Sequence, residues 1–330
     1  NARTWELSRR KSVSPHDSTG ANLIVQVKNN RVMRVVPLEN EDVNECWIAD
    51  RDRFSYESLN SEERLTQPML KQNGEWIAVD WSTALEYVAN GVQQIRADHG
   101  DAALACLASP HSTLEELYLA TQLMRGLGSD NIDSRLRAAD FMHEGKTRWL
   151  GTSIASLSTL DAVLVIGSNI RKDQPLLAQR IRQAARRGAK VFAVNEQAFD
   201  WAMPVAQAAL AESSVWVQAL ADIAAAVAQL KNAQPPVAGN ANAPGVQAIA
   251  SALLSGERKA VLLGNAAAHH AKASSLLALA QFIAQQTGST VGYLGEAANT
   301  VGAQLVSARP MSHGMNAAQL LQSTSIKAMF

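Results

Sequence analysis

The stretch Asp161-Ala162-Val163-Leu164-Val165-Ile166-Gly167-Ser168-Asn169 decides the fold class of this chain. Its first part, Ala162 to Ile166, is short, apolar and free of charge, which is typical of a strand buried on both faces of a sheet. A helix is predicted over Pro175 to Gly188, because Pro suits the first helical turn and Gly suits the C-cap. Lys190 to Asn195 is predicted as the next strand. A strand, a helix and a second strand in this order indicate an α/β fold with a parallel sheet.

The same order of elements occurs on both sides of this stretch. Ala103 to Ala108 is predicted as a strand, and Ser112-Thr113-Leu114-Glu115 fits a capping box for a helix that runs to Gly126. Ala260 to Leu263 is predicted as the strand of a third strand-helix unit, with a helix from about Lys272 to Thr287. A helix from Thr83 to about Ala97, with Ser82 as its cap, precedes the first of these units.

The first eighty residues have a different pattern, typical of β-structure and loops. Leu23 to Val27 and Arg31 to Val36 are β-branched runs separated by Lys28-Asn29-Asn30, which predicts a hairpin. Lys71 to Gly74 predicts a turn before a short strand over Glu75 to Val79. We therefore expect a β-rich module at residues 1–80.

Composition excludes several classes of function. The 330 residues contain 30 Lys+Arg and 30 Asp+Glu, so a main role in binding nucleic acid or an anionic membrane is not expected. With 47% hydrophobic and 18% charged residues, the chain is expected to be globular. The longest uncharged stretches are broken by Pro235, Pro236 and Pro244 or carry several Gln, so no direct membrane insertion is expected. The chain starts at Asn1 without a Met, and we expect it to be an excised piece of a longer protein.

The metal-ligating residues do not form a recognisable site. The chain has two cysteines, Cys46 and Cys106, which are too far apart in sequence for a cysteine-only zinc or iron–sulfur site. No two histidines have the i, i+4 helical spacing of a metal pair with a carboxylate base. Neither observation favours a metalloenzyme.

Ligands of parallel sheets bind where the strands end. Here those ends carry Ser109-Pro110-His111-Ser112, Gly167-Ser168-Asn169, Asn195-Glu196-Gln197 and Gly264-Asn265. Gly167 allows backbone N–H groups to approach a phosphate at a helix N-terminus. The sequence contains neither G-x-G-x-x-G nor the lysine of a phosphate loop, so an ordinary turn is the competing interpretation. The basic cluster Arg180, Arg182, Arg186, Arg187 and Lys190 at the end of the next helix is expected to be a solvated face.

Several segments together resemble a known family. Leu65-Thr66-Gln67-Pro68-Met69-Leu70, Gly74-Glu75-Trp76 and Asp80-Trp81-Ser82-Thr83-Ala84-Leu85 are similar to the entry signature of the molybdopterin oxidoreductase superfamily. Ser112 to Asp133 and the 161–169 stretch continue the similarity. Asp50-Arg51-Asp52-Arg53-Phe54 resembles the large G subunits of NADH-quinone oxidoreductase, respiratory complex I. The resemblance implies Rossmann-like layers with a small β-rich N-terminal module.

The resemblance also implies where an iron–sulfur cluster would lie. Some relatives place three cysteines where this chain has Ser14, Asp17 and Ala21, and a fourth where it has Ala49. A cluster needs four soft ligands, so we expect these to be lost cluster positions and expect no cofactor in this fragment. The parent protein is expected to hold 2Fe-2S and 4Fe-4S clusters in domains outside the fragment.

Active members of the superfamily bind a pterin cofactor. In this chain the resemblance implies that the corresponding crevice, at Gly167, Ser168 and Asn169, is empty. Active relatives carry an Arg after the strand that here ends at Asn195-Glu196-Gln197, and Gln197 is neutral. We therefore expect no catalytic and no cofactor-binding residues, and a non-catalytic scaffold within an oxidoreductase that passes electrons from NADH to quinone. The expected partners are other peripheral-arm subunits of complex I, at the cytoplasmic face of the bacterial inner membrane.

Two other functions remain open at this point. One is a fragment of a molybdopterin-dependent enzyme that resembles formate dehydrogenase or nitrate reductase, and the other is a nucleotide-binding module that uses the Gly167 turn. The expected domains are the module at 1–80, a first α/β domain formed by 81–150 and 246–330, and a second Rossmann-like domain at 151–245.

Overall fold

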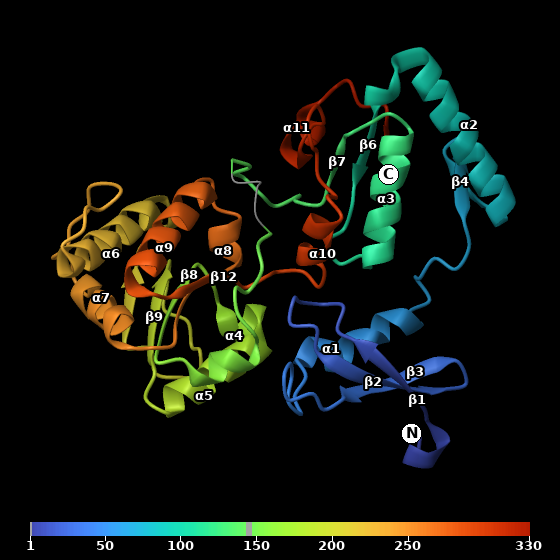
Figure 1. Cartoon of the computed structure of the whole chain (residues 1–330). Helices are drawn as coiled ribbons and strands as arrows, with labels where there is room; N and C mark the ends of the chain where they lie inside the picture. The colour runs from blue at the N-terminus through green and yellow to red at the C-terminus, as the bar shows by residue number, and fades with distance from the viewer. Residues whose placement is uncertain (1, 143–146) are drawn as a thin grey trace.

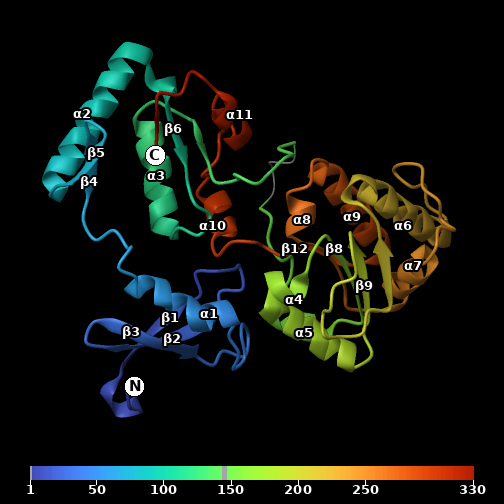
Figure 2. The same cartoon turned by 180° about the vertical axis from the view of Figure 1, so that it is seen from behind.

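The chain folds into an N-terminal β-module, a small α/β unit and a larger α/β unit (Figure 1). The computed structural model describes residues 2–142 and 147–330. Residues 143–146, which fall within the expected 81–150 segment, lie outside the described residues. The view from behind shows the same arrangement, with the larger unit beside the other two (Figure 2).

The N-terminal module is an antiparallel sheet of β1 (Ser8–Val13), β2 (Asn22–Lys28) and β3 (Arg31–Pro37), followed by the short helix α1 (Asp50–Phe54). Asn29 and Asn30 both have positive φ, which is the geometry of a two-residue turn that matches the twist of its strands. A second hairpin, β4 (Met69–Gln72) and β5 (Glu75–Ala78), turns at Asn73 and Gly74 in the same way. The hairpin predicted around Lys28 to Asn30 is present, and the turn predicted at Lys71 to Gly74 joins β4 to β5.

The small α/β unit has a parallel sheet in the order β13-β6-β7. Its elements are α2 (Trp81–His99), β6 (Leu104–Leu107), α3 (Leu114–Gly126), β7 (Ile132–Asp133), α10 (Thr300–Leu305), α11 (Ala317–Gln322) and β13 (Ala328–Met329). The predicted helix caps are each displaced. Asp80, not Ser82, accepts the hydrogen bond from the Thr83 N–H, at 2.9 Å. The capping box is Thr113 with Glu116, one residue later than expected, because Thr113 is the residue whose backbone is extended.

The larger α/β unit has a five-stranded sheet, entirely parallel, in the order β10-β9-β8-β11-β12. The strands are β8 (Ala162–Ile166), β9 (Lys190–Asn195), β10 (Gln207–Leu210), β11 (Lys259–Leu263) and β12 (Thr290–Tyr293). The helices are α4 (Ile170–Asp173), α5 (Pro175–Arg186), α6 (Trp216–Lys231), α7 (Val246–Ser255), α8 (Asn265–Ala268) and α9 (Ala273–Thr287). Short 3-10 helices connect elements in all three bodies: Thr4–Glu6, Ser55–Asn60, Asp101–Ala103, Ala155–Thr159 and Ser213–Val215.

The sheet order corrects the expected division of the chain. Residues 246–330 were expected to join 81–150, yet β11 is hydrogen-bonded directly to β8 and carries β12 on its other side. After β12 the chain returns to the small unit, where β13 pairs with β6. The strand pairing therefore places α7 to β12 in the larger unit. The sequence pattern could not predict that β11 belongs to the larger sheet, because the choice of neighbouring strand depends on contacts between distant residues.

Helices cover both faces of the larger sheet. Leu164 and Ile166 of β8 pack with α6, α7 and α9, while Val163 and Val165 pack with α5 on the opposite face. All five residues of β8 are buried. This alternation within a continuously apolar strand is the physical reason that the 162–166 run predicts a central parallel strand.

The N-terminal module docks on α5 of the larger unit. Arg180 was expected on a solvated face, but only 5% of it is exposed. Its Nη1 lies 3.1 Å from Glu45 Oε1, and Gln183 donates to the same carboxylate. Leu176 adds an apolar contact with Ala21 and Leu23. Arg180 therefore links the two bodies, whereas Arg186, Arg187 and Lys190 of the same cluster are exposed, as expected.

Among the described residues, one helical segment, Ser213–Lys231, is long and apolar enough to cross a membrane, with a mean hydropathy of 1.2. Half of this segment is buried inside the fold. Leu220, Ile223 and Val227 on it belong to the core beside the larger sheet.

Candidate functional site

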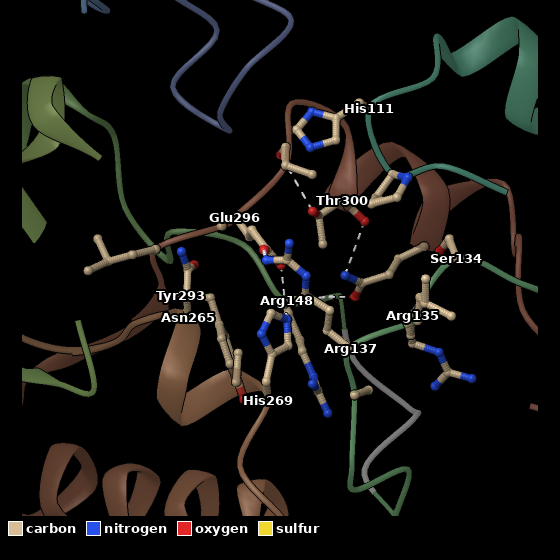
Figure 3. Close-up of a pocket in the computed structure, with 18 of the residues that line it drawn as sticks. His111, Ser134, Arg135, Arg137, Arg148, Asn265, His269, Tyr293, Glu296 and Thr300 are labelled. Atoms are coloured by element: carbon tan, nitrogen blue, oxygen red, sulfur yellow. Dashed lines mark hydrogen bonds and ion pairs between the residues drawn. The ribbon is translucent and has the colours of Figure 1, made fainter. Parts of the chain in front are cut away.

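A cavity of about 290 Å³ lies where strands of the two α/β units end. Its walls are the segments that follow β6, β7, β11 and β12 (Figure 3). Such strand ends are the usual place for ligands in parallel sheets. The volume is near the lower end of the range of about 300–1,000 Å³ for small-molecule sites.

Glu296 is the one carboxylate among the described residues that line this cavity. His269 Nε2 lies 3.1 Å from Glu296 Oε2, and Arg137 forms an ion pair with the other oxygen. The hydrogen bond from His269 lowers the pKa of Glu296, and the charges of His269, Arg137 and His111 act in the same direction. Burial opposes this shift. The carboxylate therefore stays ionised at neutral pH and neutralises part of the surrounding positive charge.

Arginines dominate the rest of the lining. Arg135 donates two hydrogen bonds to the buried Asp133. Its Nε lies 2.8 Å from Oδ1, and its Nη2 lies 2.9 Å from Oδ2. The Arg148 guanidinium lies over the Tyr293 ring, 5.4 Å from its centroid. Arg309 also lines the cavity. Four arginines and one carboxylate are among the lining residues that the structure describes.

The N-terminal module reaches the edge of this cavity. His111 Nδ1 lies 2.9 Å from the carbonyl oxygen of Pro15, in the loop between β1 and β2. Ser18 of the same loop donates a hydrogen bond of 2.9 Å to the Gly295 carbonyl. Gln174, between α4 and α5, donates to the carbonyls of Leu294 and Gly295. All three bodies therefore contribute to the surroundings of the cavity.

The predicted crevice at Gly167, Ser168 and Asn169 lies elsewhere and is packed. These residues lie between β8 and β11, where the strand order reverses, but none of them lines the cavity. The Ser168 N–H donates to the Asn195 side chain at 2.9 Å, and the Gly264 N–H donates to the Ile166 carbonyl at 2.8 Å. A Cβ added at Gly264 would lie 2.3 Å from the Ser168 Cβ. The loop after β11 thus fills the point where a ligand was expected.

The four positions matched to cluster ligands lie together in the N-terminal module. The loop from Ser14 to Ala21 is closed by a 2.8 Å hydrogen bond from the Ser14 N–H to the Ala21 carbonyl. Ser14 Oγ donates to Asp52 Oδ1 at 2.6 Å, and Asp17 Oδ2 lies 2.5 Å from Arg51 Nη2. Asp52 and Arg51 belong to α1, which begins directly after the buried Ala49.

Comparison with known proteins defines the family. The sequence model of the family "Molybdopterin oxidoreductase" matches residues 64–330, and "NADH-ubiquinone oxidoreductase NDSU1/NuoG-like, 4Fe-4S domain" matches residues 7–57. The chain belongs to the molybdopterin oxidoreductase family. In structure it is similar to acetylene hydratase from Pelobacter acetylenicus, with a TM-score of 0.58 and 13% identity over 91% of this chain and 42% of that one. This likeness shows the fold alone and agrees with the predicted fold class.

Curated relatives narrow the similarity to one kind of subunit. The NADH-quinone oxidoreductase G subunit of Rickettsia felis is 32% identical over 197 residues, 59% of this chain and 29% of that protein. The corresponding G subunit of Rickettsia conorii is 33% identical over 56% of this chain and 27% of its own length. The NADH-ubiquinone oxidoreductase 75 kDa subunit of Reclinomonas americana is 32% identical over 57% of this chain and 28% of its own length. The matches thus span less than a third of each relative.

The match at residues 7–57 corrects the prediction about cofactors. We expected no cofactor in this fragment and placed the clusters of the parent outside it, but a 4Fe-4S domain lies within the chain. The prediction was wrong because it considered only the cysteine positions, whereas the match extends over the β-module as a whole.

The side chains in that module do not provide an obvious cluster site. Within residues 2–142 and 147–330, no three His, Cys, Asp or Glu side chains are close enough to hold a metal ion. Cys46 is exposed and Cys106 is buried in the small α/β unit. Ser14 and Asp17 are already engaged by Asp52 and Arg51. These residues do not fit a cysteine-ligated cluster.

The pterin of the family is not accommodated by these residues either. The point of strand reversal, where a dinucleotide would bind, is filled by the contact of Gly264 with Ser168. The cavity itself contains no cysteine among its described lining residues. Neither place therefore fits a pterin dinucleotide.

Sequence reasoning missed the residues of the cavity, above all Arg137, His269, Tyr293 and Glu296. One signal was available: Tyr293-Leu294-Gly295-Glu296 directly follows the short run Thr290 to Gly292. Both this segment and the Gly167 stretch have a glycine close to a strand end, and here the glycine is followed by a charged residue. The missing information was that β12 lies at the sheet edge facing the small unit.

Proposed function

We propose that this chain is part of the large G subunit of an NADH-quinone oxidoreductase, in which it provides structural framework and docking surface and no catalytic residues. The observation that carries the proposal is the order of the two family matches. A 4Fe-4S domain of the type found in this subunit is followed directly by a molybdopterin oxidoreductase domain. Relatives with 30–33% identity that bear this name support it.

The internal packing supports a framework role. Arg180 of α5 and Glu45 of the N-terminal module form an almost fully buried ion pair between the two matched segments. Arg51 donates a second link, to the Asp173 carbonyl. Buried pairs of this kind fix the relative position of two bodies, because breaking one leaves an uncompensated charge. A rigid joint between a 4Fe-4S domain and an α/β domain suits a subunit that holds others in place.

As part of this proposal, the chain lies in the peripheral arm of a membrane complex, on the cytoplasmic face of a bacterial inner membrane, and binds other subunits of that arm. The alternative, a molybdopterin-dependent enzyme such as formate dehydrogenase or nitrate reductase, has less support, because the curated relatives bear NADH-quinone oxidoreductase names.

Deletion of the gene in its native host tests the proposal. We expect isolated membranes to lose NADH-dependent quinone reduction and to regain it when the gene is returned. Unchanged quinone reduction in the deletion strain would exclude the proposal. The absence of catalytic residues is tested separately with His16→Ala and Cys46→Ser, the protonable and thiol side chains of the N-terminal module. Turnover per assembled complex is expected to stay within about two-fold of the wild type.

A further inference from the structure

The two edges of the N-terminal sheet differ in how the chain covers them. At β3, the Tyr56 hydroxyl donates to the Met33 carbonyl at 2.8 Å, and the Asn60 side chain donates to the Val32 carbonyl at 3.2 Å. At β1, on the other side of the sheet, all six residues are exposed. The fold therefore covers one edge strand and leaves the other open.

The backbone of β1 presents outward donors and acceptors. The Ser14 N–H donates to the Ala21 carbonyl, and hydrogen-bonded pairs alternate along an antiparallel ladder. Arg10 is therefore in a hydrogen-bonded pair with β2, whereas the N–H and C=O groups of Arg9 and Lys11 point away from the sheet. Within the part of the chain that the structure describes, one group reaches them, the Arg10 guanidinium at 3.4 Å from the Arg9 carbonyl oxygen.

The register places several cations on one face of this sheet. Side chains alternate between the two faces along each strand, so Arg9 and Lys11 share a face with Gln26 of β2. Arg34 of β3 stands opposite Gln26, and its Nε donates to the Gln26 side chain, which is 2% exposed. The cations on this face are Arg9, Lys11, Lys28, Arg31 and Arg34.

Most of these cations have no opposite charge beside them. Lys28 Nζ lies 3.2 Å from Glu6 Oε2, and no other member of the set forms an ion pair with a described residue. The whole chain has equal numbers of Lys+Arg and Asp+Glu, 30 each. The positive charge of this face thus reflects where the charges lie and not their number. Charge separated in this way attracts and orients a partner of opposite sign.

We propose that an acidic, extended segment of another protein adds to the open edge of β1 as a fourth strand of the N-terminal sheet. The inference rests on the proposed framework function and names the chemistry of one partner. The outward groups of Arg9 and Lys11 need both acceptors and donors at strand spacing. A peptide backbone supplies both, whereas the phosphates of nucleic acid or lipid supply acceptors alone. Carboxylates on alternate residues of the added strand would lie beside Arg9 and Lys11.

The same cations exclude a second copy of β1 as the added strand. Two β1 strands side by side would place Arg9, Arg10 and Lys11 next to the cations of the other copy, and like charges opposite each other destabilise a sheet. Charged edge strands prevent pairing with unselected strands in this way. An acidic strand turns the repulsion into attraction, so the cations determine which strand can pair.

Arg186 and Lys190 offer a matched control. They lie at the end of α5 and the start of β9, both are exposed, and neither forms an ion pair with a described residue. The double variants Arg9→Gln/Lys11→Gln and Arg186→Gln/Lys190→Gln each remove two positive charges without breaking an ion pair. The charges removed by the first pair lie on β1, and those removed by the second lie on the larger unit.

Calorimetric titration of the 330-residue chain with an octapeptide of alternating Glu and Thr, with blocked ends, tests the proposal. We expect a Kd of about 100 µM or lower, and no binding of the peptide in which Lys replaces Glu. A peptide with the same Glu residues but Pro in place of the two central Thr cannot pair as a strand and should bind at least ~10-fold more weakly.

The variants locate the bound peptide. Arg9→Gln/Lys11→Gln should weaken binding at least ~10-fold and Arg186→Gln/Lys190→Gln less than ~2-fold. Circular dichroism of the unliganded variants checks that both are folded.

Four results would overturn the proposal. No saturable heat at millimolar peptide would mean that the charged edge serves to repel strands. Equal affinity for the Pro-containing peptide would leave charge attraction without an added strand. Equal weakening by the two double variants would place the peptide elsewhere. Tighter binding of a uridine octanucleotide or of phosphatidylglycerol vesicles, lost in Arg9→Gln/Lys11→Gln, would assign this face to nucleic acid or to a membrane. Quinone reduction in the deletion strain is measured independently of peptide binding, so this proposal and the proposed function can fail separately.

Discussion

The Arg51 guanidinium lies 2.5 Å from the Asp17 carboxylate, Nη2 to Oδ2, and joins α1 to the loop between β1 and β2. Asp17 is almost completely buried, with 1% of its side chain exposed, while a third of Arg51 is exposed. The same Nη2 donates to the Asp173 carbonyl of the larger α/β unit. One arginine therefore holds the loop with the cluster-type positions, the helix after Ala49 and the neighbouring unit together.

Arg51→Met is expected to lower the free energy of unfolding by about 2–4 kcal/mol, because Asp17 would remain buried without a positive partner. Urea unfolding followed by circular dichroism measures the change. Arg171→Met is the control, since it removes an exposed ion pair that contributes about 0–1 kcal/mol. If both variants lose the same free energy of unfolding, the Asp17–Arg51 pair does not hold the loop and α1 together as described.

Asp52→Asn is expected to raise the melting temperature at pH 7. Burial raises the pKa of Asp52 above its ordinary value of 3.8, and the nearby Asp17 acts in the same direction. The folded state thus holds this proton more tightly, so stability is lost as the pH rises above the ordinary value of 3.8, and the loss is complete above the folded pKa. The amide removes that cost and can still accept from Ser14 Oγ.

The advantage of Asp52→Asn should shrink as the pH falls and disappear below about 3.8, where the carboxyl is protonated in both states. Melting temperatures of both proteins across this pH range test the sign. A variant that is less stable than the wild type at pH 7 would contradict the assigned effect of burial.

The effect of Glu296→Gln on stability is expected to depend on pH in the opposite sense to that of Asp52→Asn. The hydrogen bond from His269 lowers the pKa of Glu296 below 4.5, so its contribution to stability is complete above pH 4.5 and is lost as the pH falls through the folded pKa. At pH 7 we expect the variant to lose about 1 kcal/mol. Denaturant unfolding at neutral and acidic pH measures the difference. A loss that persists unchanged in strong acid would contradict an ionic role for Glu296.

Gly167→Ala is expected to destabilise the protein by about 2–3 kcal/mol, because its Cβ would lie 2.6 Å from the Ala267 nitrogen in a backbone with φ of +64°. Gly74→Ala is the matched control. It has a φ of +89° but open space around the added atom, so only the conformational cost, about 1 kcal/mol, applies. Equal effects would mean that the strand-reversal point is not closed by packing.

Local features of the fold were predictable from the sequence. The uncharged run Ala162–Ile166 gives a central strand, and the pairs Asn29-Asn30 and Asn73-Gly74 give hairpin turns, because each depends on a few adjacent residues. Features that depend on distant partners were not predictable. The membership of β11 in the larger sheet and the burial of Arg180 against Glu45 are both of this kind.

The cavity was the largest omission for the same reason. Its walls come from segments far apart in the chain, for example Arg137 and Glu296. The sequence favoured a site at Gly167, where a strand is followed by a glycine. Tertiary packing fills that point, and the cavity lies instead beside the end of β12.

The central claim, that this chain is part of the G subunit of an NADH-quinone oxidoreductase, is tested most directly by native gel electrophoresis of membranes from the host, with the protein tagged at its own gene. We expect the tag to migrate in the band that oxidises NADH with a quinone acceptor, together with other subunits identified by mass spectrometry. A tag that migrates apart from that activity, in a band that contains molybdenum, would contradict it.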